Sequence, residues 1–201
     1  LVFYGIQAAY HSMDISIPDS VCKVSIVTPK DFKKILDQNR GSKILIHIWG
    51  LWCQFTSLGI LDIKELLPTD TANYMLFLIN ADMNTEGQID LVRKFLYSNG
   101  INIPIYFIKN KFNSMEELPD FITMQHLIDF IEVFDKDQKN IAIPYTIILD
   151  EKGKIIYKRA NELPPEDLAP TDINKEKEII DSVKREYEKM EIQKIKEILA
   201  K

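Results

Sequence analysis

Apolar residues in this chain gather in short runs that alternate with stretches of helical periodicity. The runs are rich in β-branched and aromatic residues and predict strands at 22–27, 43–49, 74–80, 101–108 and 154–159, with one more after Pro144. The periodic stretches predict helices at 29–38, from Gln54 onward, at 85–98 and at 122–134. A strongly charged helix is predicted at 172–201. We expect that helix to dock on the sheet, with a contact to a partner helix as the alternative.

The most informative stretch is residues 43–57, which read KILIHIWGLWCQFTS. Its first seven residues are apolar and β-branched, and they predict a strand that is buried on both faces. Gly50 and Leu51 then turn the chain, so Cys53 lies where a buried strand passes into a helix. Unpaired backbone N–H groups and the positive end of the helix dipole favour a thiolate at such a position.

This stretch resembles the active-site segment of the thioredoxin family, in which an apolar strand leads into Trp, a small residue, any residue, Trp and Cys-x-x-Cys. The residues in register with that pattern are Trp49, Gly50, Leu51, Trp52 and Cys53. Three positions depart from it. Thr56 replaces the second cysteine, Phe55 stands where the family often has proline, and His47 replaces the buried Asp or Asn of the strand.

A second segment, AIPYTIILDEKGK at 142–154, supports the resemblance. Pro144 matches the cis-proline that opens a strand in thioredoxin-like proteins, and Asp150 to Gly153 match the hairpin turn that ends it. The two segments are far apart in the sequence and occur in the family's order. Together they imply an α/β, thioredoxin-like fold with a central mixed β-sheet flanked by helices.

The chain is longer than a minimal thioredoxin. Its extra N-terminal residues and an added βα unit around 101–134 resemble the TlpA/ResA branch and its AhpC/TSA-like relatives. We therefore expect an N-terminal extension at 1–21, a thioredoxin-like domain at 22–161, and at 162–201 a connector and a long C-terminal helix packed on the domain. That branch works mostly outside the cytoplasm, so the resemblance implies an extracytoplasmic location and a membrane tether upstream of residue 1. The first residues, LVFYGIQAAYHS, fit the tail of a signal or anchor, or an ordinary first strand or fragment boundary.

The resemblance implies thiol–disulfide exchange at Cys53, acting on protein substrates or small thiols. Because Thr56 cannot resolve a mixed disulfide, the predicted chemistry is monothiol, and an external thiol releases the product. The Thr56 hydroxyl would donate a hydrogen bond to the thiolate. The alternative is a redox-inactive binding or scaffold domain that uses the cis-proline face and keeps Cys53 as a vestige. Cys22 is expected to be an inert apolar residue, with a role as resolving thiol as its alternative.

The other predicted site residues surround this thiol. His47 has two interpretations: a core histidine bonded to a backbone carbonyl, or a group that relays protons or, as a cation, favours the thiolate. Trp52, Ile143 and Pro144 are the predicted substrate-binding residues. In the family, the backbone before the proline pairs with the bound chain as an added strand.

Composition narrows the remaining classes. The chain has 201 residues, of which 46% are hydrophobic and 27% charged, and this fits one globular domain. A net charge of −5 without a basic patch argues against nucleic-acid binding. Two cysteines and three histidines without ligand spacing predict no metal, and no cofactor motif is present. A peroxidase is excluded because the Pro-x-x-x-Thr-x-x-Cys pattern of peroxiredoxins is missing ahead of Cys53.

Overall fold

The computed structural model describes residues 15–51, 64–68, 73–110, 122–137, 143–159 and 189–201. Its labelled helices are α2 (Pro29–Gln38), α4 (Glu86–Ser98) and α5 (Ile122–Ile131). Its strands are β1 (Val24–Val27), β2 (Lys43–Trp49), β3 (Tyr74–Asn80), β4 (Ile105–Ile108), β5 (Tyr145–Leu149) and β6 (Ile155–Arg159). Residues 189–200 form a further helical stretch, called the C-terminal helix below.

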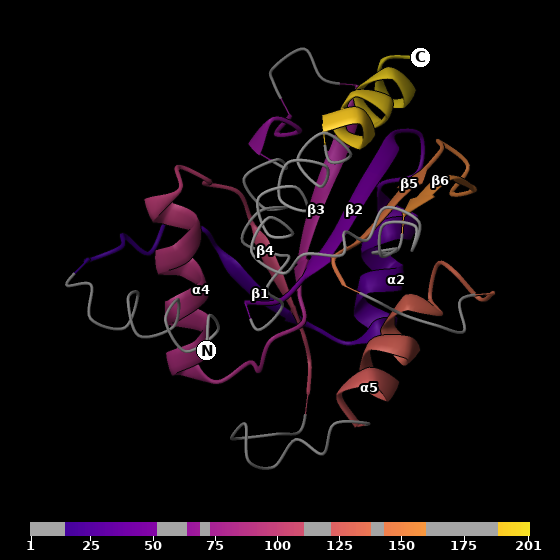
Figure 1. The fold of residues 1–201 in the computed structure, drawn as a ribbon. Helices are drawn as coiled ribbons and strands as arrows, with labels where there is room; N and C mark the ends of the chain where they lie inside the picture. The colour runs from indigo at the N-terminus through magenta and orange to yellow at the C-terminus, as the bar shows by residue number, and fades with distance from the viewer. Residues whose placement is uncertain (1–14, 52–63, 69–72, 111–121, 138–142, 160–188) are drawn as a thin grey trace, which may run out of the picture.

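The strands of the described residues form one mixed sheet in the order β1-β4-β3-β2-β5-β6 (Figure 1). β2 lies inside the sheet, parallel to β3 and antiparallel to β5. Helices α2 and α5 pack on one face, and α4 and the C-terminal helix pack on the other. This arrangement confirms the predicted α/β class and the thioredoxin-like central mixed sheet flanked by helices.

β2 is buried on both faces because both of its alternating sets of side chains are largely apolar. Ile44, Ile46 and Ile48 join the core beneath α2 and α5, whereas Leu45 and Trp49 join the clusters on the opposite face. All six residues from Ile44 to Trp49 are buried, as the continuous apolar run predicted. The chain therefore leaves a buried inner strand of the sheet just before it reaches the segment with Cys53.

Two local signals in the sequence form the structures that they predicted. Thr28 and Asp31 make a reciprocal capping box at the start of α2, with Pro29 in the first turn. In the turn between β5 and β6, Asp150 Oδ1 accepts hydrogen bonds from the backbone N–H groups of Lys152 and Lys154. Gly153 in this turn has a φ of 81°, which a residue with a side chain rarely adopts.

β4 begins at Ile105, not at residue 101 as predicted. Pro104 has no N–H to donate to a neighbouring strand. Ile101 instead donates its backbone N–H to the Leu96 carbonyl at the end of α4. The apolar run at 101–104 thus belongs to the end of a helix and a loop, although its composition resembles that of a strand.

Two other boundaries also differ from the predictions by two residues or more. β1 begins at Val24 and not at residue 22, because Cys22 has a φ of 48° in the left-handed region. α5 ends at Ile131 and not at residue 134. Val133 and Phe134 donate to carbonyls three residues earlier, as in a tight turn.

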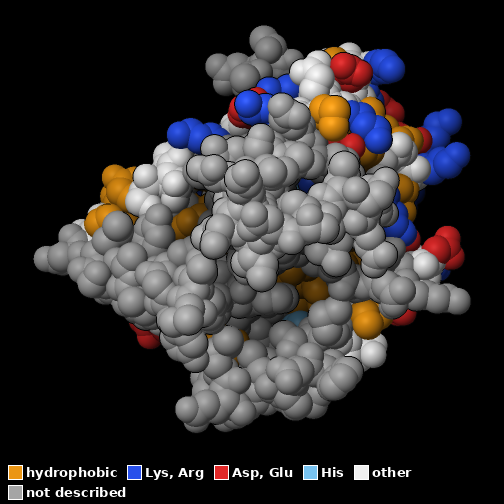
Figure 2. All heavy atoms as spheres, viewed as in Figure 1, with side chains coloured by type: hydrophobic (Ala, Val, Ile, Leu, Met, Phe, Trp, Pro, Cys, Tyr) orange, Lys and Arg blue, Asp and Glu red, His pale blue; other side chains and the backbone are white. Residues whose placement is uncertain are grey.

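The C-terminal helix packs on the sheet through Ile192, Ile195 and Leu199, which share one apolar cluster with Leu45 and Leu66. The Lys43 ammonium donates to the carbonyls of residues 198 and 199, at the negative end of this helix. Lysine and arginine side chains gather over the outer part of the helix and over β6 (Figure 2). The predicted boundaries at 21/22 and 161/162 stay predictions, because residues 1–14 and 160–188 lie outside the described residues. Within the described residues, no helix has the length and apolar character that a bilayer span requires.

Candidate functional site

The candidate site lies at the edge of the sheet where β2 ends and β5 begins. Ile48 of β2 pairs with Tyr145 of β5 in the antiparallel register. The residue after Ile48 is Trp49 and the residue before Tyr145 is Pro144, so these two are the next positions in the register. The Ile143–Pro144 peptide bond is cis, and Ile143 is buried. The described ends of the two sequence motifs therefore meet at one edge, although they are distant in the sequence.

Trp52, Cys53 and Thr56, three of the predicted site residues, lie outside the described residues. Leu51 is the last described residue before them, and it is buried. The roles assigned to these three residues, and the predicted contact between Cys53 and Pro144, therefore stay predictions.

His47 is a core side chain and is 3% exposed. Its Nδ1 lies 2.9 Å from the hydroxyl oxygen of Thr146, its cross-strand neighbour on β5, whereas its Nε2 has no hydrogen-bond partner among the described residues. Burial, and then the positive charge of Arg159, lower the pKa of His47 to about 3. The imidazole is therefore neutral at neutral pH, and the hypothesis of a cation that favours the thiolate is wrong. The core interpretation was closer, but the bond is to a side-chain hydroxyl and not to a backbone carbonyl.

Trp49 closes the apolar core beside the site. It is fully buried, and its ring centroid lies 5.8 Å from that of Phe95 on α4. Its indole Nε1 is buried and has no hydrogen-bond partner in the residues that the structure describes. The indole therefore contributes packing to the end of β2 and leaves one polar atom unsatisfied there.

A buried carboxylate that the sequence did not reveal lies beside the turn after β2. Asp82 is 4% exposed, and its Oδ2 accepts hydrogen bonds from the Leu51 backbone N–H at 2.7 Å and from Asn80 Nδ2 at 2.8 Å. Asn80 Oδ1 accepts the Asp82 N–H at 2.9 Å, and the Ala81 N–H donates to the Trp49 carbonyl at 2.7 Å. The available signal was Asn-x-Asp directly after a buried strand, because polar groups at the carboxyl ends of parallel strands often form sites.

A second buried carboxylate lies behind β5. Asp135 Oδ2 accepts a hydrogen bond from the Tyr145 hydroxyl at 2.5 Å. The same oxygen forms an ion pair with Lys158 Nζ at 2.6 Å. Burial alone would raise the pKa of Asp135, but the bonds from Lys158 and Tyr145 outweigh it and lower the pKa. Burial, followed by the Asp135 carboxylate, raises the pKa of Tyr145. This network ties the residue after Pro144 to the end of α5 and to β6.

Cys22, the other cysteine of the chain, is an inert side chain in this structure. Its Sγ is buried and donates a hydrogen bond to the Ile101 carbonyl at 3.1 Å. Burial raises its pKa more than the positive charge of Arg93 lowers it. A buried thiol with a raised pKa is a poor nucleophile, so the inert interpretation of Cys22 is the one that the structure supports.

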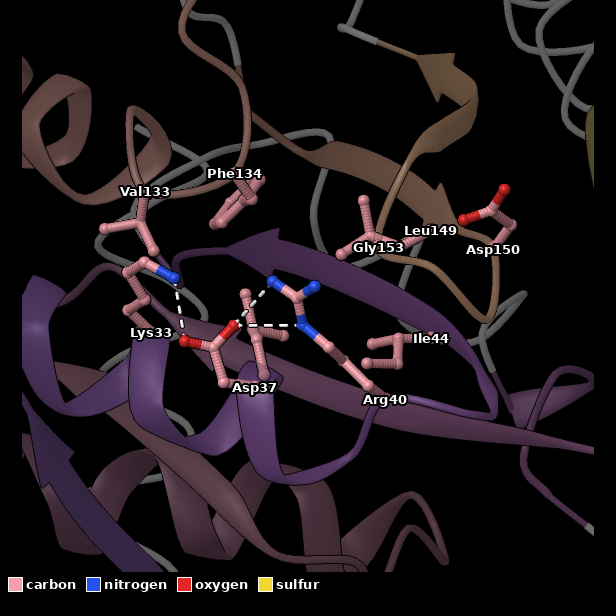
Figure 3. Close-up of a pocket in the computed structure, with 10 residues that line it drawn as sticks. Lys33, Asp37, Arg40, Ile44, Val133, Phe134, Leu149, Asp150 and Gly153 are labelled. Carbon is pink, nitrogen blue, oxygen red and sulfur yellow. Dashed lines mark hydrogen bonds and ion pairs between the residues drawn. The ribbon is translucent and has the colours of Figure 1, made fainter.

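A cavity of about 120 Å³ opens at the other end of β2, between α2, the turn after α5 and the β5–β6 turn (Figure 3). Lys33 and Arg40 at its rim are both paired with Asp37, at 2.7 and 2.8 Å. Its lining includes Ile44, at the start of β2, but neither His47 nor Pro144. This cavity is therefore separate from the candidate site. Among the described residues, no three His, Cys, Asp or Glu side chains are grouped as metal ligands would be.

Comparisons with known proteins give structural similarity only. No protein-family model and no curated protein sequence matches the chain. Among solved structures, a thioredoxin-family thiol:disulfide interchange protein from Chlorobium tepidum is 15% identical over 63% of this chain and 74% of its own, with a TM-score of 0.45. StoA from Bacillus subtilis is 22% identical over 65% of this chain and 81% of its own, with a TM-score of 0.37. A DsbF homologue from Corynebacterium diphtheriae is 20% identical over 73% and 75%, with a TM-score of 0.43. Similarities at this level do not establish a shared function.

Proposed function

We propose that this protein is a thiol–disulfide oxidoreductase-like protein that acts through a single cysteine, Cys53. The observation that carries the proposal is the register between β2 and β5, which continues from the Ile48–Tyr145 pair to Trp49 and Pro144 at the end of a strand that is buried from Ile44 onward. Cys53 follows Leu51 by two residues, so chain connectivity keeps the two Cα atoms within about 7 Å. That limit supports a site in which the thiol lies near the proline edge of the sheet.

The proposed chemistry is monothiol exchange. The Cys53 thiolate attacks one sulfur of a substrate disulfide, and a mixed disulfide forms while the other sulfur leaves as a thiolate. A second, external thiolate then attacks the mixed disulfide and releases Cys53 as a thiolate. The substrates are disulfides of proteins or of small thiols, and the external thiol supplies the electrons that Thr56 cannot.

The state of Cys22 supports an external resolving thiol. Its sulfur is buried and bonded to a backbone carbonyl, and its pKa is raised, so it is not prepared to attack a mixed disulfide. Cys22 and Cys53 are the only two cysteines of the chain. A thiol from another molecule must therefore complete the cycle.

Thr56 and His47 support the thiol in different ways in this proposal. The Thr56 hydroxyl donates a hydrogen bond to the Cys53 thiolate and so lowers the pKa of the thiol. His47 takes part as a neutral group, because a pKa of about 3 leaves its imidazole uncharged at neutral pH. Its Nε2, which has no partner in the described part of the chain, is the atom available for a hydrogen bond in the buried layer on the Trp49 face of the sheet.

Substrate binding is assigned to Trp52, Ile143 and Pro144. A bound peptide would pair with the backbone at Ile143 as an added strand, and Trp52 would contact it through an apolar surface. The network around Asp135 supports this assignment, because the hydroxyl of Tyr145, directly after the proline, donates to the Asp135 carboxylate, which is itself paired with Lys158.

The resemblance of the sequence to the TlpA/ResA branch also suggests where in the cell the protein works. The extra N-terminal residues and the added βα unit, which includes β4 and α5, correspond to features of that branch. We infer an extracytoplasmic protein of the periplasm or cell envelope, with a membrane tether upstream of residue 1. Expression of the full-length gene with an epitope tag, followed by cell fractionation, tests this location.

The central test measures the reactivity of Cys53 in a Cys22→Ala background, which leaves one thiol in the chain. The rate of alkylation by iodoacetamide is followed from pH 5 to pH 10, and mixed-disulfide formation with oxidised glutathione is followed by mass spectrometry. We expect a thiol pKa at least about one unit below the ordinary value near 8.5. The glutathione adduct should form, and dithiothreitol should release it.

The matched control is the variant with both Cys22→Ala and Cys53→Ser, which should give no alkylation and no adduct. A Cys53 thiol with an ordinary pKa and no adduct would reject the oxidoreductase function. That result would favour the redox-inactive binding domain.

A further inference from the structure

We propose that Asp82 is a positioning residue for the thiol site: its carboxylate fixes the turn at Gly50 and Leu51 from which the chain enters the segment with Cys53. The inference rests on the proposed function of Cys53. The observation that supports it most directly is the 2.7 Å hydrogen bond from the Leu51 backbone N–H to Asp82 Oδ2.

This hydrogen bond satisfies a donor that has little access to water. Leu51 is 5% exposed and Asp82 is 4% exposed. A buried backbone N–H needs a partner, and Asp82 is the acceptor that the fold provides here.

The carboxylate is itself held by a rigid framework. Asn80, the last residue of β3, is fully buried and pairs with Trp49 of β2 and with Phe107 of β4. Its amide nitrogen donates to Asp82 Oδ2 at 2.8 Å, and its amide oxygen accepts the Asp82 backbone N–H at 2.9 Å. The side-chain carboxyl group and the backbone N–H of Asp82 are thus both bonded to Asn80, in the central part of the sheet.

A third strand end contributes to the same framework. Asn110 lies two residues beyond β4, and its Nδ2 donates to the Asp82 carbonyl at 3.2 Å. The groups that follow β2, β3 and β4 are therefore joined at the carboxyl edge of the parallel strands, where sites form in α/β sheets. Such a framework fixes the turn from which the chain enters the segment with Cys53, and a fixed turn is what a precisely placed nucleophile requires.

The test compares two substitutions in the Cys22→Ala background. Asp82→Asn keeps one oxygen that can accept the Leu51 N–H, whereas Asp82→Leu has a similar size and no acceptor. The readouts are the rate of mixed-disulfide formation between Cys53 and oxidised glutathione, and the hydrogen-exchange protection of the Leu51 amide. We expect the Leu variant to react at least about tenfold more slowly and to lose amide protection. The Asn variant should stay within about threefold of the parent protein.

The matched control is Leu127→Ala, which removes a buried side chain beneath α5 on the opposite face of the sheet. This change lowers stability without touching the turn, so the exchange rate of Cys53 should stay within about twofold of the parent. If Asp82→Leu does not fold, Asp82→Ser replaces it, because a serine hydroxyl is too short to reach Leu51. The same slow exchange is expected of the Ser variant.

The inference is overturned if the variant without an acceptor reacts as fast as the parent, or slows no more than Leu127→Ala does. It is also overturned if Asp82→Asn slows as much as Asp82→Leu, because the acceptor would then be irrelevant. Failure of the proposed function gives a different result: the parent Cys53 itself reacts no faster than free glutathione.

Discussion

Two neighbouring residues of β5, Tyr145 and Thr146, meet buried ionisable groups on opposite faces of the sheet. On the face beneath α2 and α5, Tyr145 donates to Asp135, whose carboxylate is also paired with Lys158. On the face that includes Trp49, Thr146 bonds one ring nitrogen of His47, and the other nitrogen has no partner within the ranges that the structure describes. The first group is charged and held by two partners, and the second is neutral and only half satisfied.

The difference has a physical cause. A carboxylate in the interior is tolerated only when hydrogen bonds and an opposite charge replace water, and Asp135 has both. An imidazole avoids the same cost by giving up its proton, so His47 needs no counter-charge and its pKa falls to about 3. The Asp135 network therefore serves stability, whereas the His47 position keeps a spare hydrogen-bonding atom near the candidate site.

The largest effect should come from Asp135→Ala, which leaves Lys158 and the Tyr145 hydroxyl without their buried partner. Loss of one member of a buried ion pair costs about 3–5 kcal/mol, and we expect about 3 kcal/mol here because Lys158 is partly exposed. Urea unfolding at pH 7 measures this difference. Asp129→Ala, a change at an exposed carboxylate on α5, should stay within about 0.5 kcal/mol of wild type.

The sign of the pH dependence follows from the lowered pKa of Asp135. The stabilisation is present above the ordinary aspartate pKa of about 3.9 and is lost as pH falls through the lower folded value. The gap between wild type and Asp135→Ala should therefore narrow only below about pH 4. A gap that closes already near pH 6 would contradict the assignment.

A smaller effect is expected from His47→Asn, and it should depend on pH in a different window. The unfolded histidine binds a proton below its ordinary pKa of about 6.5, whereas the folded one does so only near 3. Wild-type stability should therefore fall by up to about 1.4 kcal/mol per pH unit in this range, or about 2 kcal/mol from pH 6 to pH 4.5. The variant lacks this loss, so denaturant midpoints at the two pH values should differ less than in wild type. Equal acid sensitivity of the two proteins would show that His47 is not buried in the neutral form.

The smallest effects on stability are expected from substitutions at the two neighbouring residues of β5, Tyr145 and Thr146. Tyr145→Phe removes one bond to a charged acceptor and should cost about 1.5 kcal/mol, whereas Thr146→Val removes a bond between neutral groups and should cost about 1 kcal/mol. In a double-mutant cycle, Tyr145→Phe should couple to Asp135→Ala but not to His47→Asn. Coupling across the sheet to His47 would mean that the two faces do not act independently.

Much of the architecture could be predicted because its signals are local. β2 and β3 begin and end at the predicted residues, and α2 starts at the cap that Thr28 and Pro29 indicate. The errors occur where a local pattern competes with a distant contact. Residues 101–104 have the composition of a strand, but the end of α4 and Pro104 hold them outside the sheet.

The candidate site was predicted less completely. The sequence pointed to Cys53, Pro144 and His47, and the register of β2 with β5 joins the strand that carries His47 to the strand that begins directly after Pro144. Asp82 and Asp135 were missed, because each gains its importance from partners in other elements. For His47 the sequence left two interpretations open. The apolar run around it predicted a buried strand, and only the structure identifies the Thr146 hydroxyl as its partner.

The sequence by itself determined the order of strands and helices, because alternation of apolar residues, capping and turn formation depend on residues only a few positions apart. Only the tertiary structure decided which polar groups are buried together: Leu51 with Asp82, His47 with Thr146, and Asp135 with Tyr145 and Lys158. Protonation and hydrogen bonding depend on the solvent and partners around a group. The assembled sheet fixes both.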